Sequence, residues 1–106
     1  MPNEQVFLNY VLEQLDSLGD IKIKKMFGGA TLYFEQKVVG LICDNQLFIK
    51  PTPAGKAFMG TVVEAPPYQG AKDYYLIDDK LDDSNWLCEL VLKSATELPK
   101  IKKKIK

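Results

Sequence analysis

Residues 21–50, IKIKKMFGGATLYFEQKVVGLICDNQLFIK, decide the fold because apolar and polar side chains alternate along much of their length. Ile21 and Ile23 alternate with lysines, a pattern typical of a β-strand with one face in water. Three more strands are predicted at residues 30–35, 38–43 and 46–50, each rich in aromatic or branched residues. The stretch therefore predicts a sheet rather than a helix.

Short breaks separate these strands at Gly28-Gly29, near Gln36-Lys37 and at Asp44-Asn45. A parallel return needs a crossover of about a dozen residues, so breaks this short join antiparallel neighbours. The sequence predicts a meander of three or four strands. Gly28-Gly29 also invites comparison with an anion-binding nest. The pair leads into a strand rather than a helix, so the geometry of a turn or bulge is the favoured reason for it.

A helix is predicted before the meander, with Asn3 as its N-cap, Glu4 in its first turn and Gly19 as its stop. Its apolar side chains recur at helical spacing, which predicts one buried stripe. The stripe consists of Phe7, Leu8, Val11, Leu12, Leu15 and Leu18.

Two more helices and a strand follow the meander. Thr52 and Pro53 are typical of a helix start, and Gly60 ends that short helix. Pro66-Pro67 excludes a helix or a central strand nearby, and a strand is predicted at 74–77. The last helix is expected to end at Pro99. Its buried stripe consists of Leu87, Leu90, Val91, Ala95 and Leu98.

Together these elements predict an α+β fold with two layers, in which helices pack on one face of a mostly antiparallel sheet. The expected order is a helix, three or four strands, a short helix, one or two strands and a helix. With 106 residues the chain has the length of one domain. We expect that domain to span residues 1–99 and the lysine-rich residues 100–106 to form a flexible tail.

The amino-acid composition limits the kinds of chemistry that the chain can perform. Fourteen lysines balance fourteen acidic residues, and the chain has neither arginine nor histidine. Without histidine it lacks the usual general base and the commonest metal ligand. Without arginine it lacks the side chain that most often reads bases. We expect no catalytic residues, no metal site and no cofactor, and hence a protein that is not an enzyme.

Individual nucleophiles and acids give the same expectation. Cys43 is followed by Asp44 rather than by the positive neighbour that would activate a thiol. The acidic cluster resembles a cation site in composition alone, and helix capping is the favoured explanation. That cluster consists of Asp78, Asp79, Asp82 and Asp83.

The two cysteines, Cys43 and Cys88, each lie in an apolar run and are expected to be buried free thiols of a reducing compartment. No N-terminal signal pattern and no apolar run of about 20 residues is visible. The expected location is the cytoplasm, without membrane insertion.

Direct nucleic-acid binding is an alternative that rests on two features. The first is the basic tail, whose lysines are Lys100, Lys102, Lys103, Lys104 and Lys106. The second is the interleaving of aromatic and basic residues, as on platforms that stack single strands. These residues are Phe27, Tyr33, Phe48 and Tyr75 with Lys24, Lys25 and Lys50. Against this, aromatic residues of a small sheet are usually core, and a terminal lysine run is usually solvated.

Several motifs occur in order along the chain, from a Met-Phe-Gly-Gly turn through a glycine-containing strand to a Leu-aromatic-aliphatic-Lys strand. Their residues are Met26, Phe27, Gly28, Gly29, Gly40, Leu47, Phe48 and Lys50. In this order the motifs resemble the N-terminal domain of the TfoX/Sxy family, bacterial proteins that regulate natural competence genes. Lys25 stands where the family usually has arginine, and the second, helical domain of the competence regulators is not present in these 106 residues.

The resemblance implies a two-layer α+β domain similar to type III secretion chaperones, without enzymatic activity. The leading expectation is thus a non-enzymatic interaction module, similar to a transcription regulator and acting through protein–protein contacts. A homodimer is one form of such contact, since the edge of a small sheet can pair with another chain. A small-molecule-binding protein or an enzyme is the second alternative, which a deep pocket with convergent polar groups would favour.

Overall fold

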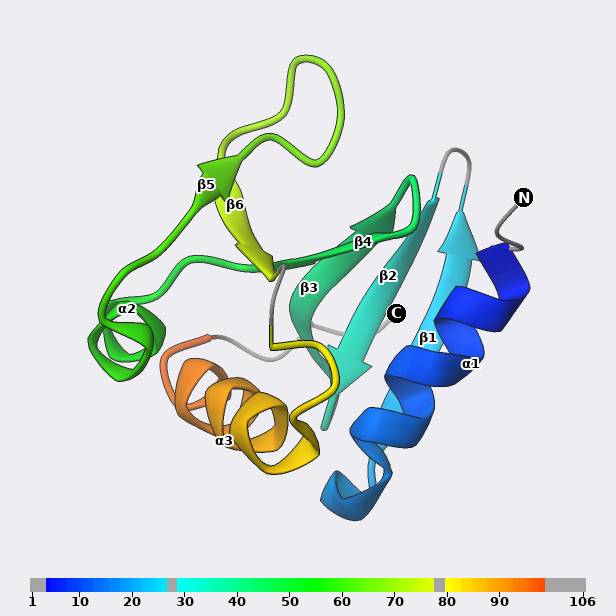
Figure 1. Cartoon of the computed structure of the whole chain (residues 1–106), viewed down its shortest axis with the longest axis horizontal. Helices are drawn as coiled ribbons and strands as arrows, with labels where there is room; N and C mark the ends of the chain where they lie inside the picture. The colour runs from blue at the N-terminus through cyan, green and yellow to red at the C-terminus, as the bar shows by residue number, and fades with distance from the viewer. Residues whose placement is uncertain (1–3, 27–28, 78–79, 99–106) are drawn as a thin grey trace, which may run out of the picture.

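The computed structural model describes residues 4–26, 29–77 and 80–98 of the chain. It confirms the predicted α+β fold, with three α-helices and a six-stranded antiparallel sheet (Figure 1). In chain order the elements are α1 Glu4–Gln14, the 3₁₀ turn η1 Asp16–Leu18, β1 Ile21–Met26, β2 Gly29–Phe34, β3 Lys37–Cys43, β4 Gln46–Ile49, α2 Pro53–Met59, β5 Glu64–Ala65, β6 Tyr74–Ile77 and α3 Ser84–Ala95.

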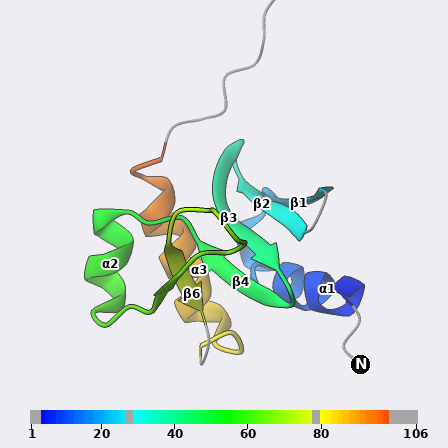
Figure 2. The same ribbon diagram turned by 90° about the horizontal axis from the view of Figure 1, so that it is seen from above.

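The strand order across the sheet is β1-β2-β3-β4-β6-β5, and every neighbouring pair is antiparallel. The first four strands form the predicted meander. The later pair, β5 and β6, extends the sheet beyond β4, which places β1 and β5 at the two edges. In Figures 1 and 2, α1 runs alongside β1 and α2 stands beside α3.

The turns of the meander differ from prediction at two places. Gly29, predicted to lie in the first break, is the first residue of β2 and pairs with Met26. The β2–β3 turn consists of Glu35 and Gln36, with φ of 51° and 66°, and not of Gln36 and Lys37. Lys37 instead pairs with Phe34 as the first residue of β3. A two-residue hairpin whose residues both have positive φ matches the twist of its strands, although Gly or Asn usually occupies it. This turn is therefore hard to place from its residue types.

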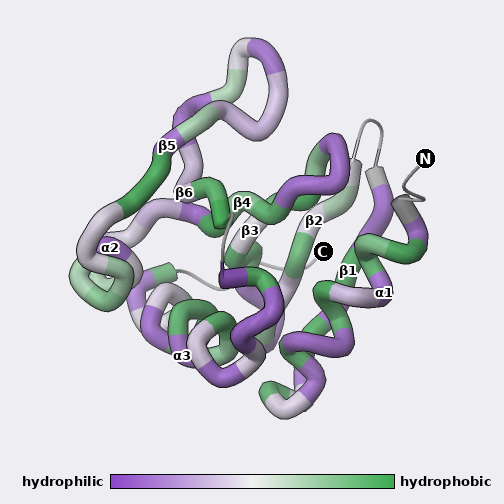
Figure 3. Tube along the Cα trace, in the orientation of Figure 1, coloured by the Kyte–Doolittle hydropathy of each residue, from purple (hydrophilic) through white to green (hydrophobic). Residues whose placement is uncertain are grey.

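The second turn confirms its prediction. Asp44 and Asn45 join β3 to β4 with φ of 53° and 57°. Asp and Asn tolerate this backbone region better than most residues, because their short side chains hydrogen-bond locally. In Figure 3 the chain is hydrophilic at this turn and hydrophobic in the strand that follows it.

One core lies between the sheet and the helices. The predicted stripe of the first helix places Leu8, Val11 and Leu15 in it, each at most 2% exposed. The remaining core side chains come from β2, β3, β4, β6 and α3. They are Ala30, Leu32, Phe34, Val39, Ile42, Leu47, Ile49, Tyr75, Ile77, Leu87, Cys88, Leu90, Val91 and Ala95. The alternation along β2 assigns Thr31 and Tyr33 to the opposite face, which we call the helix-free face.

Two helix ends differ from prediction. The first helix ends at Gln14 and continues as η1, whose C-cap is Gly19 with φ 87°. The last helix ends at Ala95, before the predicted stop at Pro99. The Lys37 side chain donates to the Ala95 carbonyl oxygen at 2.6 Å, so a β-strand lysine satisfies the end of this helix. Leu98 lies beyond the helix and packs against the core.

The N-caps of α2 and α3 agree with the sequence predictions. The Thr52 hydroxyl accepts a hydrogen bond from the Gly55 amide at 2.9 Å, with Pro53 in the first turn of α2. The Asp83 carboxylate accepts one from the Trp86 amide at 3.1 Å and so begins α3. The predicted cap Asn3 and the acidic pair Asp78-Asp79 lie outside the described residues. Within the described ranges, no helix is long and apolar enough to cross a membrane.

Candidate functional site

The open edge of the sheet at β1 is the first element of the candidate site. Asp20 and Glu35 are opposite each other, and the Glu35 amide donates to the Asp20 carbonyl oxygen at 3.1 Å. Backbone pairing alternates along an antiparallel ladder, so every second residue from Asp20 turns its backbone groups toward β2. The backbone groups of Ile21, Ile23 and Lys25 consequently point away from the sheet. They form a row about 13 Å long that can pair with another strand.

The second edge of the sheet, at β5, offers far fewer backbone groups for pairing with another strand. β5 has only two residues, Glu64 and Ala65, and Pro66-Pro67 follows at once. Proline has no amide hydrogen to donate, and a short edge strand protects a sheet from pairing. Of the two edges, β1 with its six residues is the one suited to binding an extended chain.

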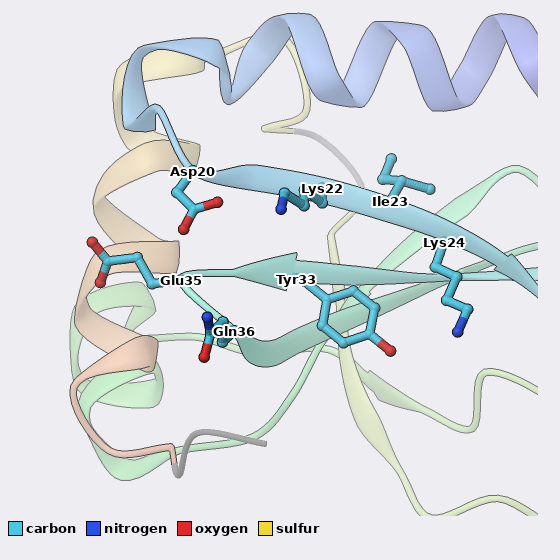
Figure 4. Close-up of a pocket in the computed structure, with 7 residues that line it drawn as sticks. All are labelled: Asp20, Lys22, Ile23, Lys24, Tyr33, Glu35 and Gln36. Carbon is cyan, nitrogen blue, oxygen red and sulfur yellow. The ribbon is translucent and has the colours of Figure 1, made fainter. Parts of the chain in front are cut away.

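Beside this edge, the helix-free face carries a basic strip formed by Lys22 and Lys24. Lys22 lies opposite Tyr33 on β2, and Lys24 lies opposite Thr31. The strip borders a shallow hollow of about 460 Å³, which these lysines and Tyr33 line together with Asp20, Glu35 and Gln36. Figure 4 shows the two acidic side chains and Gln36 at one end of the hollow and Lys24 toward the other.

The lysines of β1 are unpaired within the part of the chain that the structure describes. There, the one ion pair joins Lys93 to Glu89 at 3.5 Å on α3. Lys22, Lys24 and Lys25 are all exposed and take part in none. An exposed, unpaired ammonium group keeps its attraction for an anion that approaches from solution.

The residues of the family motif build the sheet. A Cβ atom on Gly29 would lie 2.5 Å from the Ile42 carbonyl oxygen, and one on Gly40 would lie 2.4 Å from that of Phe48. Only glycine fits such close approaches of neighbouring strands. Leu47 is in the core with no exposed surface.

The other motif residues complete this picture. Lys50 is half-buried, and its amide donates to the Val39 carbonyl oxygen at 2.9 Å, which continues the β3–β4 ladder. Met26 ends β1 opposite Gly29. Phe27 and Gly28 lie outside the described residues. The described part of the motif therefore specifies strand pairing, and the candidate site lies beside it on β1.

Two of the described rings of the hypothetical nucleic-acid platform are buried. Phe48 is 2% exposed and Tyr75 is 7% exposed, and Tyr75 packs in the core. Neither ring can stack on a base without unfolding part of the sheet. Tyr33 remains half-exposed beside Lys24, whereas Phe27 and the basic tail, Lys100 to Lys106, lie outside the described residues.

Among the described residues, buried polar groups are few. Cys43 and Cys88 are buried and form no disulfide, as predicted, and the Cys88 thiol donates to the Gln14 carbonyl oxygen at 3.4 Å. Burial raises the pKa of the Tyr75 phenol above its usual range, and the Glu64 carboxylate opposite it raises that pKa further. Among the described residues, no three His, Cys, Asp or Glu side chains gather where they could hold a metal ion.

The sequence pattern did not single out Lys22 or Ile23 as site residues. Their alternation predicted a strand with one wet face, but not that this strand would lie at an edge. The signal was the placement of several lysines in one short strand, since lysine is common where an edge strand must avoid uncontrolled pairing.

The fold and the edge define a class of small α+β domain, in which a four-stranded meander leaves its first strand open. The chain belongs to the family of the TfoX N-terminal domain, whose pattern matches residues 13–98. It is also similar to a protein of Spirochaeta aurantia described as an uncharacterized 12.7 kDa protein in the trpE 5′ region. The two are 34% identical over 99 residues, which cover 93% of this chain and 86% of that protein.

Proposed function

We propose that this protein is a non-enzymatic interaction module that binds an extended segment of a partner protein as an added strand along β1. The observation that carries the proposal is the row of outward backbone groups at Ile21, Ile23 and Lys25. Strand addition draws its affinity from such main-chain hydrogen bonds. A protein without catalytic residues acts by binding, and the open edge of a small sheet is a surface on which another chain can bind.

The flanking structure supports the same use of the edge. β1 is held on its inner side by six register pairs with β2, from Ile21–Phe34 to Met26–Gly29. The two strands of this hairpin are therefore ordered before a partner arrives, which lowers the entropic cost of binding. Ile21 and Ile23 pack against the core from this strand and hold it in place.

The proposal is tested by a pair of substitutions at one position. Ile23→Pro removes the outward amide hydrogen of residue 23, whereas Ile23→Ala removes most of the same side chain and keeps that hydrogen. Proline is tolerated in an edge strand when its nitrogen faces away from the sheet. Both variants are first compared by circular dichroism and thermal unfolding, so that a loss of fold is not mistaken for a loss of binding.

Binders are then selected from a phage-displayed random peptide library on the unaltered protein and measured against both variants. We expect binding to persist in Ile23→Ala and to fall about tenfold or more in Ile23→Pro, because main-chain hydrogen bonds at the site are lost. If both folded variants bind every selected peptide equally, strand addition at β1 is wrong.

A further inference from the structure

We infer that the segment bound along β1 is acidic, with carboxylates at alternate positions that face Lys22 and Lys24. This inference rests on the proposed function, because it names the chemistry of the chain that the edge would accept. It is carried by the position of the basic strip beside the open backbone groups.

The geometry of an added strand places its side chains in register with the strip. Residues directly opposite each other on antiparallel strands point to the same face of the sheet. The two partner residues opposite Lys22 and Lys24 would thus lie on the helix-free face, two positions apart. Lys22 and Lys24 are exposed there and make no ion pair with any described residue. Glu or Asp at both partner positions would supply the missing counter-charges.

The intervening partner residue meets different chemistry. It would lie opposite Ile23, whose side chain belongs to the helix side of the sheet and is only partly buried. An aliphatic residue there would cover the remaining apolar surface of Ile23. The edge therefore fits a segment in which acidic and aliphatic residues alternate.

The acidic residues of the hollow limit where such a segment can carry charge. Asp20 and Glu35 are exposed at the end of β1 that begins with Ile21. A carboxylate placed beside them would be repelled, so the partner's acidic positions are confined to the stretch opposite Lys22 to Lys25. This arrangement fixes the register of the partner as well as its charge.

A second copy of this chain fits the edge poorly. Antiparallel pairing of β1 with its own copy about a twofold axis through Ile23 would place Lys22 of each copy opposite Lys24 of the other on the helix-free face. Directly opposed like charges destabilise a strand pair. The lysines thus oppose self-pairing while they favour an acidic strand.

Single-stranded nucleic acid would use only part of the site. Its phosphates could meet the basic strip, but it has no peptide backbone to pair with Ile21, Ile23 and Lys25. Asp20 and Glu35 would also repel a phosphate chain along the same hollow. The observations therefore favour a protein segment.

The test uses three synthetic peptides that share alternate valines and differ at the positions between them, which are all Glu, all Gln or all Lys. Fluorescence anisotropy measures each peptide against the whole protein. We expect the Glu peptide to bind about tenfold tighter than the Gln peptide at low salt, from two cross-strand charge pairs. The Lys peptide should bind most weakly, and added salt should narrow the differences.

A double variant, Lys22→Gln with Lys24→Gln, should abolish the preference for Glu over Gln. The matched control is Lys56→Gln with Lys72→Gln, which removes the same charge from exposed positions on α2 and in the β5–β6 loop. The control should retain the preference, because net charge alone does not set it.

The outcomes separate the two proposals. Equal binding of the Glu and Gln peptides, with both lost in Ile23→Pro and retained in Ile23→Ala, would overturn the acidic partner and leave strand addition intact. If Ile23→Pro leaves the binding of the Glu peptide unchanged, both proposals are overturned, since simple charge attraction would explain that binding. Tighter binding of an oligothymidine to the same lysines, or a dimer in sedimentation that Ile23→Pro dissociates, would also overturn the inference.

Discussion

The backbone of Gly40 runs so close to the carbonyl oxygen of Phe48 that a Cβ atom on residue 40 would lie 2.4 Å from it. Gly40 is on β3 and Phe48 on β4, next to the register pair Leu41–Phe48. The Ile49 side chain would lie 3.3 Å from this added Cβ atom. The obstacle is backbone, which cannot rotate away, so the two strands can approach this closely only because residue 40 has no side chain.

The first prediction concerns this contact. Gly40→Ala should lower the free energy of unfolding by about 2 kcal/mol or more, because the strands must separate to admit the methyl group. Urea denaturation followed by circular dichroism measures the change. Gly55→Ala is the contrasting variant, because its Cβ atom would meet side chains rather than backbone. The nearest atoms there are the side-chain oxygens of Ser94 and Thr52, both at 2.9 Å. A Gly40→Ala protein as stable as the unaltered chain would show that the strands are farther apart than described.

The second prediction concerns the start of α2. Thr52→Ala removes the hydroxyl that accepts from the Gly55 amide, and it should destabilise the protein by about 1 kcal/mol. Thr52→Ser keeps the hydroxyl and should cost much less. Thermal unfolding of both variants measures the difference. Equal stability of the two would mean that the cap contributes nothing.

The third prediction concerns Ser94, whose side chain has no exposed surface and whose hydroxyl has no hydrogen-bond partner among the described residues. A buried hydroxyl without a partner costs free energy. Ser94→Ala should therefore stabilise the protein by about 1 kcal/mol, measured by urea denaturation.

Combining Ser94→Ala with Gly55→Ala tests the close approach of residues 94 and 55. The Ser94 hydroxyl lies 2.9 Å from where the new Cβ on residue 55 would be. Removing the hydroxyl should make Gly55→Ala better tolerated, because alanine favours the helix by about 1 kcal/mol over glycine. If Ser94→Ala destabilises the protein, the hydroxyl has a partner and the reasoning fails.

The fourth prediction concerns alkaline pH. Burial, then the charge of Glu64, raises the pKa of Tyr75 above its ordinary value of 10.0. The folded protein holds the phenol proton more tightly than the unfolded chain, so this contribution to stability is complete below pH 10.0 and is lost as pH rises through the folded pKa. The free energy of unfolding should fall in that range.

Tyr75→Phe isolates this effect, because it removes the titrating group and keeps the ring. Its stability should fall less steeply above pH 10.0 than that of the unaltered protein. Glu64→Gln should shift the titration of Tyr75 downward, which the absorbance of the tyrosinate band reports. Identical alkaline slopes for Tyr75→Phe and the unaltered chain would exclude Tyr75 as the cause.

Much of the fold could be predicted from local patterns. The alternation along residues 21–50 predicted the meander, and Thr52-Pro53 and Gly60 predicted the limits of α2, because these signals act within a few residues. The turn at Glu35-Gln36 was misplaced by one residue, since neither residue type is typical of positive φ. The end of α3 at Ala95 coincides with a hydrogen bond from Lys37, a residue distant in sequence whose contact no local pattern reveals.

The candidate site was less predictable for the same reason. That β1 lies at an edge follows from the strand order, in which β6 and β5 join the sheet beside β4 rather than beside β1. Residues 64–77 contain no local feature that selects one side over the other. The roles of Gly29 and Gly40 likewise depend on how closely separate strands approach, and spacing along the chain does not reveal it.

The strand order also bears on the sequence of events in folding. β1 to β4 pair with their neighbours in the chain through short connections, whereas β4 and β6 must meet across α2 and β5. Closing a longer loop costs more chain entropy, so local hairpins form faster than distant pairings. The meander would thus assemble as the nucleus and the β5–β6 arm would join late. Amide hydrogens of the arm should exchange through smaller local openings, whereas the amides of β1 that face β2, such as those of Lys22 and Lys24, should belong to the slowest-exchanging unit.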